Sequence, residues 1–351
     1  MSWENNVRRV VPYVAGEQPK NSQVIKLNTN ECPYPPAPGV ADVLHQFNED
    51  VLRKYPDPDV AALREVLAKR YHVKPEQVFV GVGSDDVLAM AFLTFFNSDK
   101  PILFPDITYS FYDVWADLYR IPYEMQPLDE SFHIVKEDYF KENGGIVIAN
   151  PNAPTGIEAP LSMIEEIIAA NQDVVVIVDE AYVDFGGTSA VSLLDKYENL
   201  LVVQTFSKSR SMAGMRIGFA IGNEKLIGYL NDAKFSFNSY TMNATSIVAG
   251  VASVEDEAYF QEITGKVVAT RERFRKELEA LDFESLDSKT NFLFAKHKSK
   301  SGQEIFDALR ANNIYVRHWN KPRIGEYLRI SIGTDEEMDK VIAFLKEYLE
   351  K

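Results

Sequence analysis

The sequence predicts an α/β protein with a large, mostly parallel sheet domain covered by helices and a smaller α+β domain after it. First, strand-like and helix-like segments alternate between residues 78 and 221, as in sheets built from β-α-β units. Second, some expected strands are continuously apolar, such as Val-Val-Val-Ile-Val at 174–178, which indicates burial on both faces. Third, a long helical tract after residue 237 leads into short strands and helices of a different style.

The elements of the larger domain follow a regular order. An irregular arm rich in Pro and Asn precedes expected helices at 40–47 and 60–72. Apolar runs then predict strands, and helical periodicity between them predicts helices. The strands are expected at 78–81, 101–104, 146–150, 174–179, 200–205 and 217–221, and the helices at 86–96, 110–118 and 161–170.

The remaining chain predicts the second domain. A helical tract from about 245 to 281 is followed by a strand at 291–295, a helix at 302–312, strands at 314–317 and 327–331, and a final helix from 336. We place the boundary near residue 240. The expected parts are an arm at 1–27 that packs with the small domain, a large domain at 28–240 and a small domain at 241–351.

Composition excludes several classes of function. The chain has 351 residues and a formal net charge of −15, which argues against a nucleic-acid or anionic-membrane surface. No apolar run reaches eighteen residues, and no apolar stretch follows Arg8 and Arg9, so we expect neither export nor membrane insertion. The single cysteine, Cys32, fits a reducing cytoplasm and is interpreted as a packing residue. No metal site is expected.

Polar motifs end several of the expected strands, where ligands bind in open α/β sheets. Gly-Val-Gly-Ser-Asp-Asp at 81–86 follows a strand and opens a helix, so its backbone N–H groups could bind an anion. It is not a dinucleotide fingerprint, because the third glycine is missing. Other strands end in Asn-Pro-Asn-Ala-Pro-Thr-Gly at 150–156, in Asp179 followed by Tyr182, and in Thr-Phe-Ser-Lys at 205–208.

Each motif alone has an ordinary structural interpretation, such as a helix cap for Asp179 or a solvated loop for Lys208. Together they describe one chemistry. A lysine can form a Schiff base with an aldehyde cofactor, and an aspartate can keep a pyridine nitrogen protonated. Arg216, Ser207 and a helix N-terminus suit a phosphate group. The set predicts a site for pyridoxal 5′-phosphate.

The chain resembles a known family in these motifs. Leu-Asn-Thr-Asn-Glu-Cys-Pro-Tyr-Pro-Pro, Arg-Lys-Tyr-Pro-Asp-Pro, Tyr-Ser-Phe-Tyr, the 150–156 turn, Asp-Glu-Ala-Tyr-Val-Asp-Phe, the 207–219 segment, Tyr-Val-Arg and Leu-Arg-Ile-Ser-Ile-Gly occur in the order expected. They resemble the fold-type I, aspartate aminotransferase-like, pyridoxal-phosphate enzymes, and among these most closely the histidinol-phosphate aminotransferases. Two departures are Cys32 and Ala153, where the family commonly has Asn.

The resemblance implies a role for each matching residue around the cofactor ring. Lys208 would hold the cofactor as a Schiff base and shuttle the proton at the substrate Cα. Asp179 would pair with the ring nitrogen, and Asn152 and Tyr182 would bond the ring oxygen, so these four are the expected catalytic residues. Tyr109 would stack on the ring.

The resemblance also implies how the phosphate and the substrate are held. Ser84 and Asp85, through their backbone, with Ser207 and Arg216, would bind the cofactor phosphate. Tyr55 would reach that phosphate in a partner subunit, which implies a homodimer with shared active sites. The expected substrate-binding residues are Arg317, Arg329, Tyr13 and Asn152. Surface solvation for the two arginines and simple packing for Tyr13 remain alternatives.

The expected activity is transamination between an amino donor and 2-oxoglutarate. The resemblance implies that L-histidinol phosphate is the donor. An aromatic amino-acid aminotransferase for Phe or Tyr would use the same apparatus and is the first alternative. Threonine-phosphate decarboxylase is a second, and a non-enzymatic cofactor-binding module is a third, which the charge of −15 disfavours.

Overall fold

The larger domain is built on a seven-stranded sheet. The computed structural model describes residues 2–20 and 23–350, so residues 1, 21 and 22 of the expected arm lie outside the described residues. The strand order is β2-β8-β7-β6-β5-β3-β4, and only β8 runs antiparallel to its neighbours. The strands are β2 (Val78–Gly81), β3 (Ile102–Pro105), β4 (Tyr123–Gln126), β5 (Gly145–Ala149), β6 (Val176–Asp179), β7 (Leu200–Thr205) and β8 (Gly218–Gly222).

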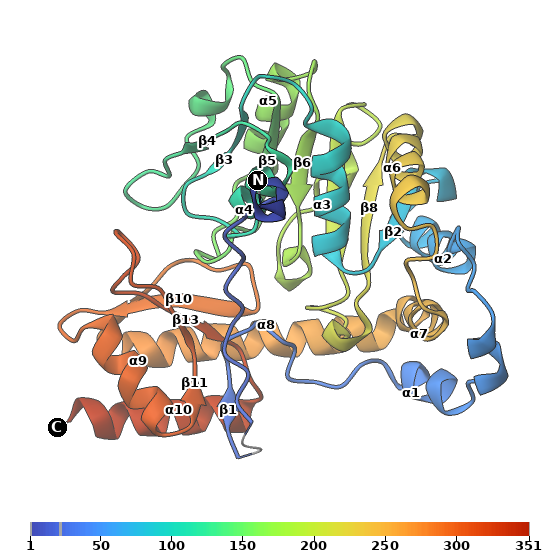
Figure 1. The fold of residues 1–351 in the computed structure, drawn as a ribbon. Helices are drawn as coiled ribbons and strands as arrows, with labels where there is room; N and C mark the ends of the chain where they lie inside the picture. Colours follow the sequence, from blue (N-terminus) through green and yellow to red (C-terminus); the bar gives the residue numbers. More distant parts are fainter. Residues whose placement is uncertain (1, 21–22, 351) are drawn as a thin grey trace.

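Both faces of this sheet are buried, which explains its continuously apolar strands. Ile177 of β6 points into one core and Val176 and Val178 into the other, because successive side chains alternate between faces. Helices α3 (Ser84–Phe95), α4 (Tyr112–Tyr119) and α6 (Glu224–Phe237) cover the first face, and α2 (Ala61–Tyr71), α5 (Leu161–Ala170) and α7 (Ala244–Glu255) cover the second. Figure 1 shows α3 and α6 lying in front of the sheet. The predicted α/β class is confirmed.

The smaller domain combines two short sheets with helices. An antiparallel sheet has the order β12-β13-β10-β9, and β1 pairs in parallel with β11. Helices α8, α9 and α10 pack against these strands around one core. The bounds are β1 (Ile25–Lys26), β9 (Phe283–Ser285), β10 (Phe292–His297), β11 (Ile314–Tyr315), β12 (Arg317–His318), β13 (Leu328–Ser331), α8 (Glu257–Glu279), α9 (Gly302–Ala311) and α10 (Asp335–Leu349).

The N-terminal arm contacts both domains. Arg8 donates a hydrogen bond to the Leu118 carbonyl on α4, and Tyr13 stacks on Phe111 with ring centroids 4.2 Å apart. The arm then descends across the molecule and enters the smaller domain through β1 (Figure 1). Helix α1 (Pro38–His45) begins only after this arm and packs on α7.

The long helical tract expected at 245–281 consists of two helices. Asp256 separates them, and its Oδ1 accepts a hydrogen bond from the Tyr259 N–H at 3.1 Å, which caps α8. Helix α7 packs on α1 and α2 of the larger domain, whereas α8 runs into the smaller one (Figure 1). Our boundary near 240 remains a prediction.

The short 3-10 helices are η1 (Trp3–Asn6), η2 (Glu49–Arg53), η3 (Pro75–Gln77), η4 (Lys136–Tyr139), η5 (Val183–Phe185), η6 (Ala190–Leu193) and η7 (Ala213–Met215).

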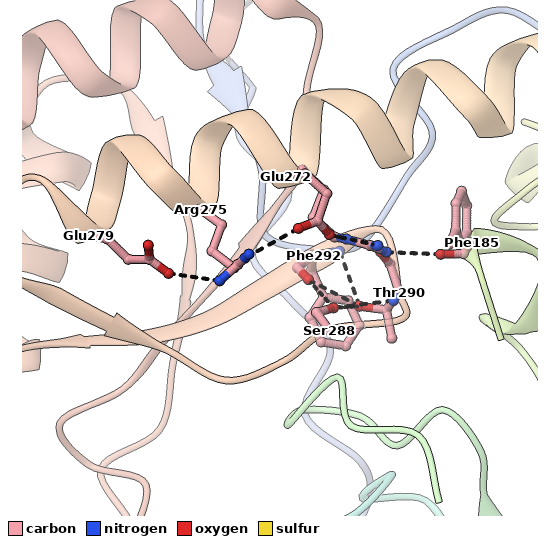
Figure 2. A network of polar contacts seen from close by, with 8 residues as sticks. Phe185, Glu272, Arg275, Glu279, Ser288, Thr290 and Phe292 are labelled. Atoms are coloured by element: carbon pink, nitrogen blue, oxygen red, sulfur yellow. Dashed lines mark hydrogen bonds and ion pairs between the residues drawn. The ribbon is translucent and has the colours of Figure 1, made fainter. Parts of the chain in front are cut away.

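A buried arginine on α8 ties the two domains together beside the strand ends. The Arg271 guanidinium donates to the carbonyls of Phe185, at 2.9 Å, and Thr290, at 2.8 Å. It also pairs with Glu272, which is bonded to Arg275 in turn (Figure 2). Phe185 ends η5 of the larger domain and Thr290 precedes β10 of the smaller one, so this network fixes the relative position of segments from both.

Within residues 2–20 and 23–350, no helix combines the length and the apolar character needed to cross a bilayer.

Candidate active site

Two adjoining cavities lie where the carboxyl ends of the parallel strands meet. The smaller, about 220 Å³, is lined by residues that follow β2, β6 and β7, and it includes Asp179 and Lys208. The larger, about 440 Å³, extends toward the smaller domain and includes Arg317 and Arg329. Lys208 lines both cavities, so its amine can serve a group in either one.

Asp179 is a buried carboxylate at the end of β6. Its side chain accepts hydrogen bonds from the Tyr112 hydroxyl, at 2.8 Å, and from the Ala181 N–H, at 3.2 Å. Burial raises the pKa of Asp179 to about 6, although both hydrogen bonds act in the opposite direction. Since burial disfavours the ionised form, a cationic ligand in the cavity would stabilise this carboxylate.

Tyr112 is a site residue that the sequence analysis missed. It is fully buried at the start of α4 and orients Asp179 through its hydroxyl. Burial raises the pKa of Tyr112 well above its usual value, and the neighbouring Asp179 raises it further. A signal was present, because Tyr112 is the second tyrosine of the Tyr-Ser-Phe-Tyr motif in which only Tyr109 was assigned a role.

The first turn of α3 forms an anion cradle together with Arg216. Its N-cap residue, Gly83, has φ +87° and supplies no side-chain cap, which leaves N–H groups of this turn available to an anion. A Cβ at Gly83 would lie 2.5 Å from Nη2 of Arg216, so both the backbone conformation and the close approach require glycine. Arg216 lies 3.4 Å from the Ser207 hydroxyl and 3.3 Å from an Asp85 carboxylate oxygen. The structure therefore brings together the four phosphate ligands predicted within one subunit, Ser84, Asp85, Ser207 and Arg216.

Lys208 follows β7 and faces the segment 27–32, which comes after the arm. Its Nζ donates to the Thr29 carbonyl at 3.1 Å and lies 5.8 Å from the centre of the Tyr182 ring. The Tyr182 hydroxyl in turn accepts a hydrogen bond from the Asn30 amide at 2.8 Å. The Leu-Asn-Thr-Asn-Glu-Cys segment thus forms one wall of the site beside the lysine.

Three of the predicted cofactor residues differ in how they lie. The Tyr109 ring lines both cavities, and its hydroxyl donates to Asp85 at 2.8 Å. Asn152 is buried and lines neither cavity, and its amide is bonded to the Ile107 carbonyl and the Thr155 hydroxyl. Tyr55 is 82% exposed, stacks on Tyr240 and lines neither cavity. The roles of Asn152 and Tyr55 remain predictions.

Two arginines face the larger cavity from paired strands. Arg317 of β12 lies directly opposite Arg329 of β13. Arg329 donates to the Asn28 carbonyl at 2.8 Å, while its buried Nε has no hydrogen-bond partner within the described part of the chain. Burial lowers the pKa of Arg329, and the charge of Arg317 adds to this effect. Arg317 donates to the Val14 carbonyl at 3.3 Å. Together with Tyr13, which lines the same cavity, they form an anion site beside the arm.

Comparison with known proteins agrees with this geometry. The model of the aminotransferase class I and II family matches residues 22–345. Histidinol-phosphate aminotransferase of Lactococcus lactis subsp. cremoris (strain MG1363) is 54% identical over 349 residues, which cover 99% of this chain and 98% of that protein. The corresponding protein of Clostridium botulinum (strain Langeland / NCTC 10281 / Type F) is 50% identical and covers 99% of both chains.

Among solved structures, histidinol-phosphate aminotransferase from Sinorhizobium meliloti in complex with pyridoxal-5′-phosphate superposes with a TM-score of 0.84. It is 23% identical, and the match covers 93% of this chain and 91% of that one. This similarity confirms the fold. The chain belongs to the aminotransferase class I and II family.

Proposed function

We propose that this chain is a pyridoxal-phosphate-dependent aminotransferase that interconverts L-histidinol phosphate and 2-oxoglutarate with imidazole acetol phosphate and L-glutamate. In histidine biosynthesis the direction would be from imidazole acetol phosphate and glutamate to histidinol phosphate. The observation that carries the proposal is the convergence of Lys208, the buried Asp179 and the anion cradle at one edge of the sheet, next to a pocket with two arginines. The names of the relatives at 54% and 50% identity support the choice of substrate.

The residues of the smaller cavity fit pyridoxal phosphate. The uncapped first turn of α3, with Ser207 and Arg216, suits a phosphate dianion. Asp179, whose ionised form burial destabilises, suits a protonated ring nitrogen as its partner. Lys208 would hold the aldehyde covalently, and Tyr109 would cover the ring. When bound, the cofactor supplies a carbonyl that accepts an amino group and a protonated ring that draws electrons from the substrate Cα.

The chain's own residues would carry out the proton transfer. Lys208 lines both cavities, so its free amine would be placed to take the proton from the substrate Cα. Tyr112 and the Ala181 N–H hold the Asp179 carboxylate in place. The position of this carboxylate would therefore stay the same during the reaction.

The paired arginines would serve both halves of the reaction. A guanidinium binds a phosphate or a carboxylate through two parallel hydrogen bonds. Arg317 and Arg329 would therefore hold the phosphate monoester of one substrate and the distal carboxylate of glutamate or 2-oxoglutarate in turn. Tyr13, anchored on Phe111, would cover the substrate side chain.

A turnover assay tests the choice of donor. Glutamate formation from 2-oxoglutarate would be measured with L-histidinol phosphate, L-phenylalanine and L-tyrosine, and carbon dioxide release with O-phospho-L-threonine. We expect kcat/KM for histidinol phosphate to exceed that for either aromatic amino acid by about tenfold or more, since hydrogen bonds to a charged group contribute about 1.5–3 kcal/mol. A preference for phenylalanine or tyrosine would favour an aromatic aminotransferase, and carbon dioxide release would favour the decarboxylase.

We also propose a cytoplasmic homodimer with shared active sites. An exposed aromatic surface supports the dimer: Tyr55 stacks on Tyr240 at 4.6 Å, Leu52 lies near Tyr55 in sequence, and Phe237 is 74% exposed. Such apolar groups are typical of interfaces. Tyr55 lines neither cavity of its own chain. We therefore propose that it contacts the cofactor phosphate in the cavity of a second copy.

Subunit mixing tests whether Tyr55 acts in the partner's site. Tyr55→Ala and Lys208→Ala proteins would be mixed at a cofactor concentration too low to fill the Tyr55→Ala dimer. A hybrid dimer then contains one site with both native residues, so we expect activity in about a quarter of all sites after random exchange. A mixture of Lys208→Ala with the double variant is the matched control and should stay inactive. Hybrid dimers that form, as shown by mass-tagged subunits, and remain inactive would contradict the shared site.

A further inference from the structure

We propose that Trp319 is a positioning residue that holds Arg317 and Arg329 together as one anion site and so sets the enzyme's affinity for phosphate monoesters and carboxylates. The identity of these anions rests on the function proposed above. The contact of Trp319 with both arginines, called the clamp below, rests on the geometry of these three side chains.

Trp319 lies in the connection between β12 and β13, and both arginines contact its ring. The guanidinium carbon of Arg317 is 5.3 Å from the ring centroid, and that of Arg329 is 5.2 Å from it. Trp319 lines the larger cavity together with both arginines. One indole ring therefore contacts the two cations that face this cavity from neighbouring strands.

The two arginines need such a contact. The strand register places Arg317 directly opposite Arg329, and like charges at facing positions destabilise a sheet. Arg329 is further disfavoured by burial, which lowers its pKa. Among residues 2–20 and 23–350 neither guanidinium pairs with a carboxylate; their hydrogen bonds go to the carbonyls of Val14 and Asn28.

An aromatic ring stabilises these cations without using their hydrogen-bond donors. A carboxylate would accept the N–H groups and would cancel the charge that the substrate anion requires. A π face attracts a guanidinium electrostatically and leaves its edge, which carries the N–H groups, free to bind an anion. Phe292 gives Arg329 a second aromatic contact, at 5.4 Å. The site therefore remains cationic and has donors available.

The loop that carries Trp319 is fixed at several points. A hydrogen bond of 2.7 Å joins the His318 ring and the Gly325 carbonyl across it, and the Lys321 N–H donates to the Trp319 carbonyl at 2.9 Å. Arg323 reaches the larger domain, where it donates to the Asp129 carbonyl and pairs with Asp106. These contacts fix the loop backbone from which the indole ring reaches the arginines.

Phosphate binding to the cofactor-loaded enzyme measures the clamp directly. With the cofactor site filled, inorganic phosphate would be titrated by calorimetry into wild type, Trp319→Leu and Trp319→Phe. We expect Trp319→Leu to bind phosphate about tenfold more weakly, because two cation–π contacts are lost. Trp319→Phe keeps an aromatic face and should stay within about threefold of wild type. In steady state, KM should rise for the donor and the acceptor alike while kcat changes little, since uniform binding is lost.

Phe132→Leu is the matched control. Phe132 also packs under an arginine of the same loop, Arg323, at 5.1 Å, and belongs to the cluster that Trp319 joins. We expect this variant to lower the melting temperature but to leave the phosphate Kd unchanged. If Phe132→Leu weakened phosphate binding as much as Trp319→Leu, general loosening of the loop would be the cause and the clamp would be wrong.

A double-mutant cycle shows whether Trp319 acts through the arginines. In an Arg317→Ala background, Trp319→Leu should weaken phosphate binding by much less than tenfold, because one of its two partners is gone. An undiminished effect, or wild-type affinity in Trp319→Leu alone, would overturn the proposal. If Trp319→Leu does not fold, Trp319→Met carries the same test. Since calorimetry needs no turnover, a clamp that holds in an enzyme inactive toward histidinol phosphate would refute only the proposed substrate.

Discussion

Lys208→Ala will lower kcat by roughly 10⁴-fold or more, because the variant loses both the covalent attachment and the base at the substrate Cα. Lys321 also lines the larger cavity, but Lys208 is the lysine that lines the smaller cavity beside Asp179 in the part of the chain that the structure describes. Steady-state turnover with saturating cofactor and both substrates measures the loss. The anion cradle is intact in the variant, so the protein should still retain the cofactor noncovalently.

Lys225→Ala is the matched control, because Lys225 is an exposed lysine on α6. It should have wild-type kcat and the same melting temperature. Turnover of Lys208→Ala within about tenfold of wild type would contradict the assigned role, provided that far-UV circular dichroism shows the fold unchanged.

Asp179→Asn will lower kcat on the order of 10³-fold, since the carboxylate that keeps the ring nitrogen protonated is replaced by a neutral amide. Its geometry should survive, because an amide oxygen can still accept the Tyr112 hydrogen bond. Ser207→Ala is the comparison: it removes one contact in the anion cradle and should mainly weaken cofactor binding. A loss in Ser207→Ala as large as that in Asp179→Asn at saturating cofactor would contradict the special role of the carboxylate.

Buried Asp179 also makes the stability of the cofactor-free protein depend on pH. Burial raises the pKa of Asp179 from 3.8 to about 6. Between these two pH values the folded state therefore keeps a proton that the unfolded state has released. The stabilising contribution is therefore complete below about pH 3.8 and is lost as pH rises through about 6. The total is on the order of 3 kcal/mol.

Urea unfolding at several pH values measures this effect. The free energy of unfolding of wild type minus that of Asp179→Asn should fall as pH rises from 4 to 7, since taking the difference removes contributions from other carboxylates. Added cofactor should flatten this dependence, because its protonated ring would then pair with the carboxylate. A difference that rises with pH would show that Asp179 is stabilised as an anion by the protein alone.

Sequence periodicity predicted most of the larger domain because its strands, apart from the partly exposed β4, which was missed, are buried on both faces. The strand Leu200–Thr205 is buried throughout and begins with four apolar residues, and helices such as Leu161–Ala170 carry their apolar residues at helical spacing. The direction of β8 could not be inferred in this way, since an antiparallel strand inside the sheet has the same buried pattern. Helix α6 was missed even though Asn223 caps it through its side chain.

The site could be predicted where its residues follow strands and could not where side-chain packing decides. Asp179, Ser207 and Lys208 each end a parallel strand, so topology alone brings them to one edge. Tyr112 contacts Asp179 across 67 residues of sequence, and only the folded chain brings α4 to β6. Trp319 is close in sequence to Arg317, but its contact with both arginines depends on the pairing of β12 with β13.

The most direct test of the account is the absorbance spectrum of the cofactor-loaded enzyme during addition of L-histidinol phosphate without any oxo acid. We predict that the bound cofactor converts from its aldehyde form to its amine form at low substrate concentration, and that 2-oxoglutarate then restores the first spectrum. A spectrum that ignores histidinol phosphate but responds to phenylalanine or tyrosine would contradict the substrate. A spectrum that no amino donor changes would contradict the proposed activity itself.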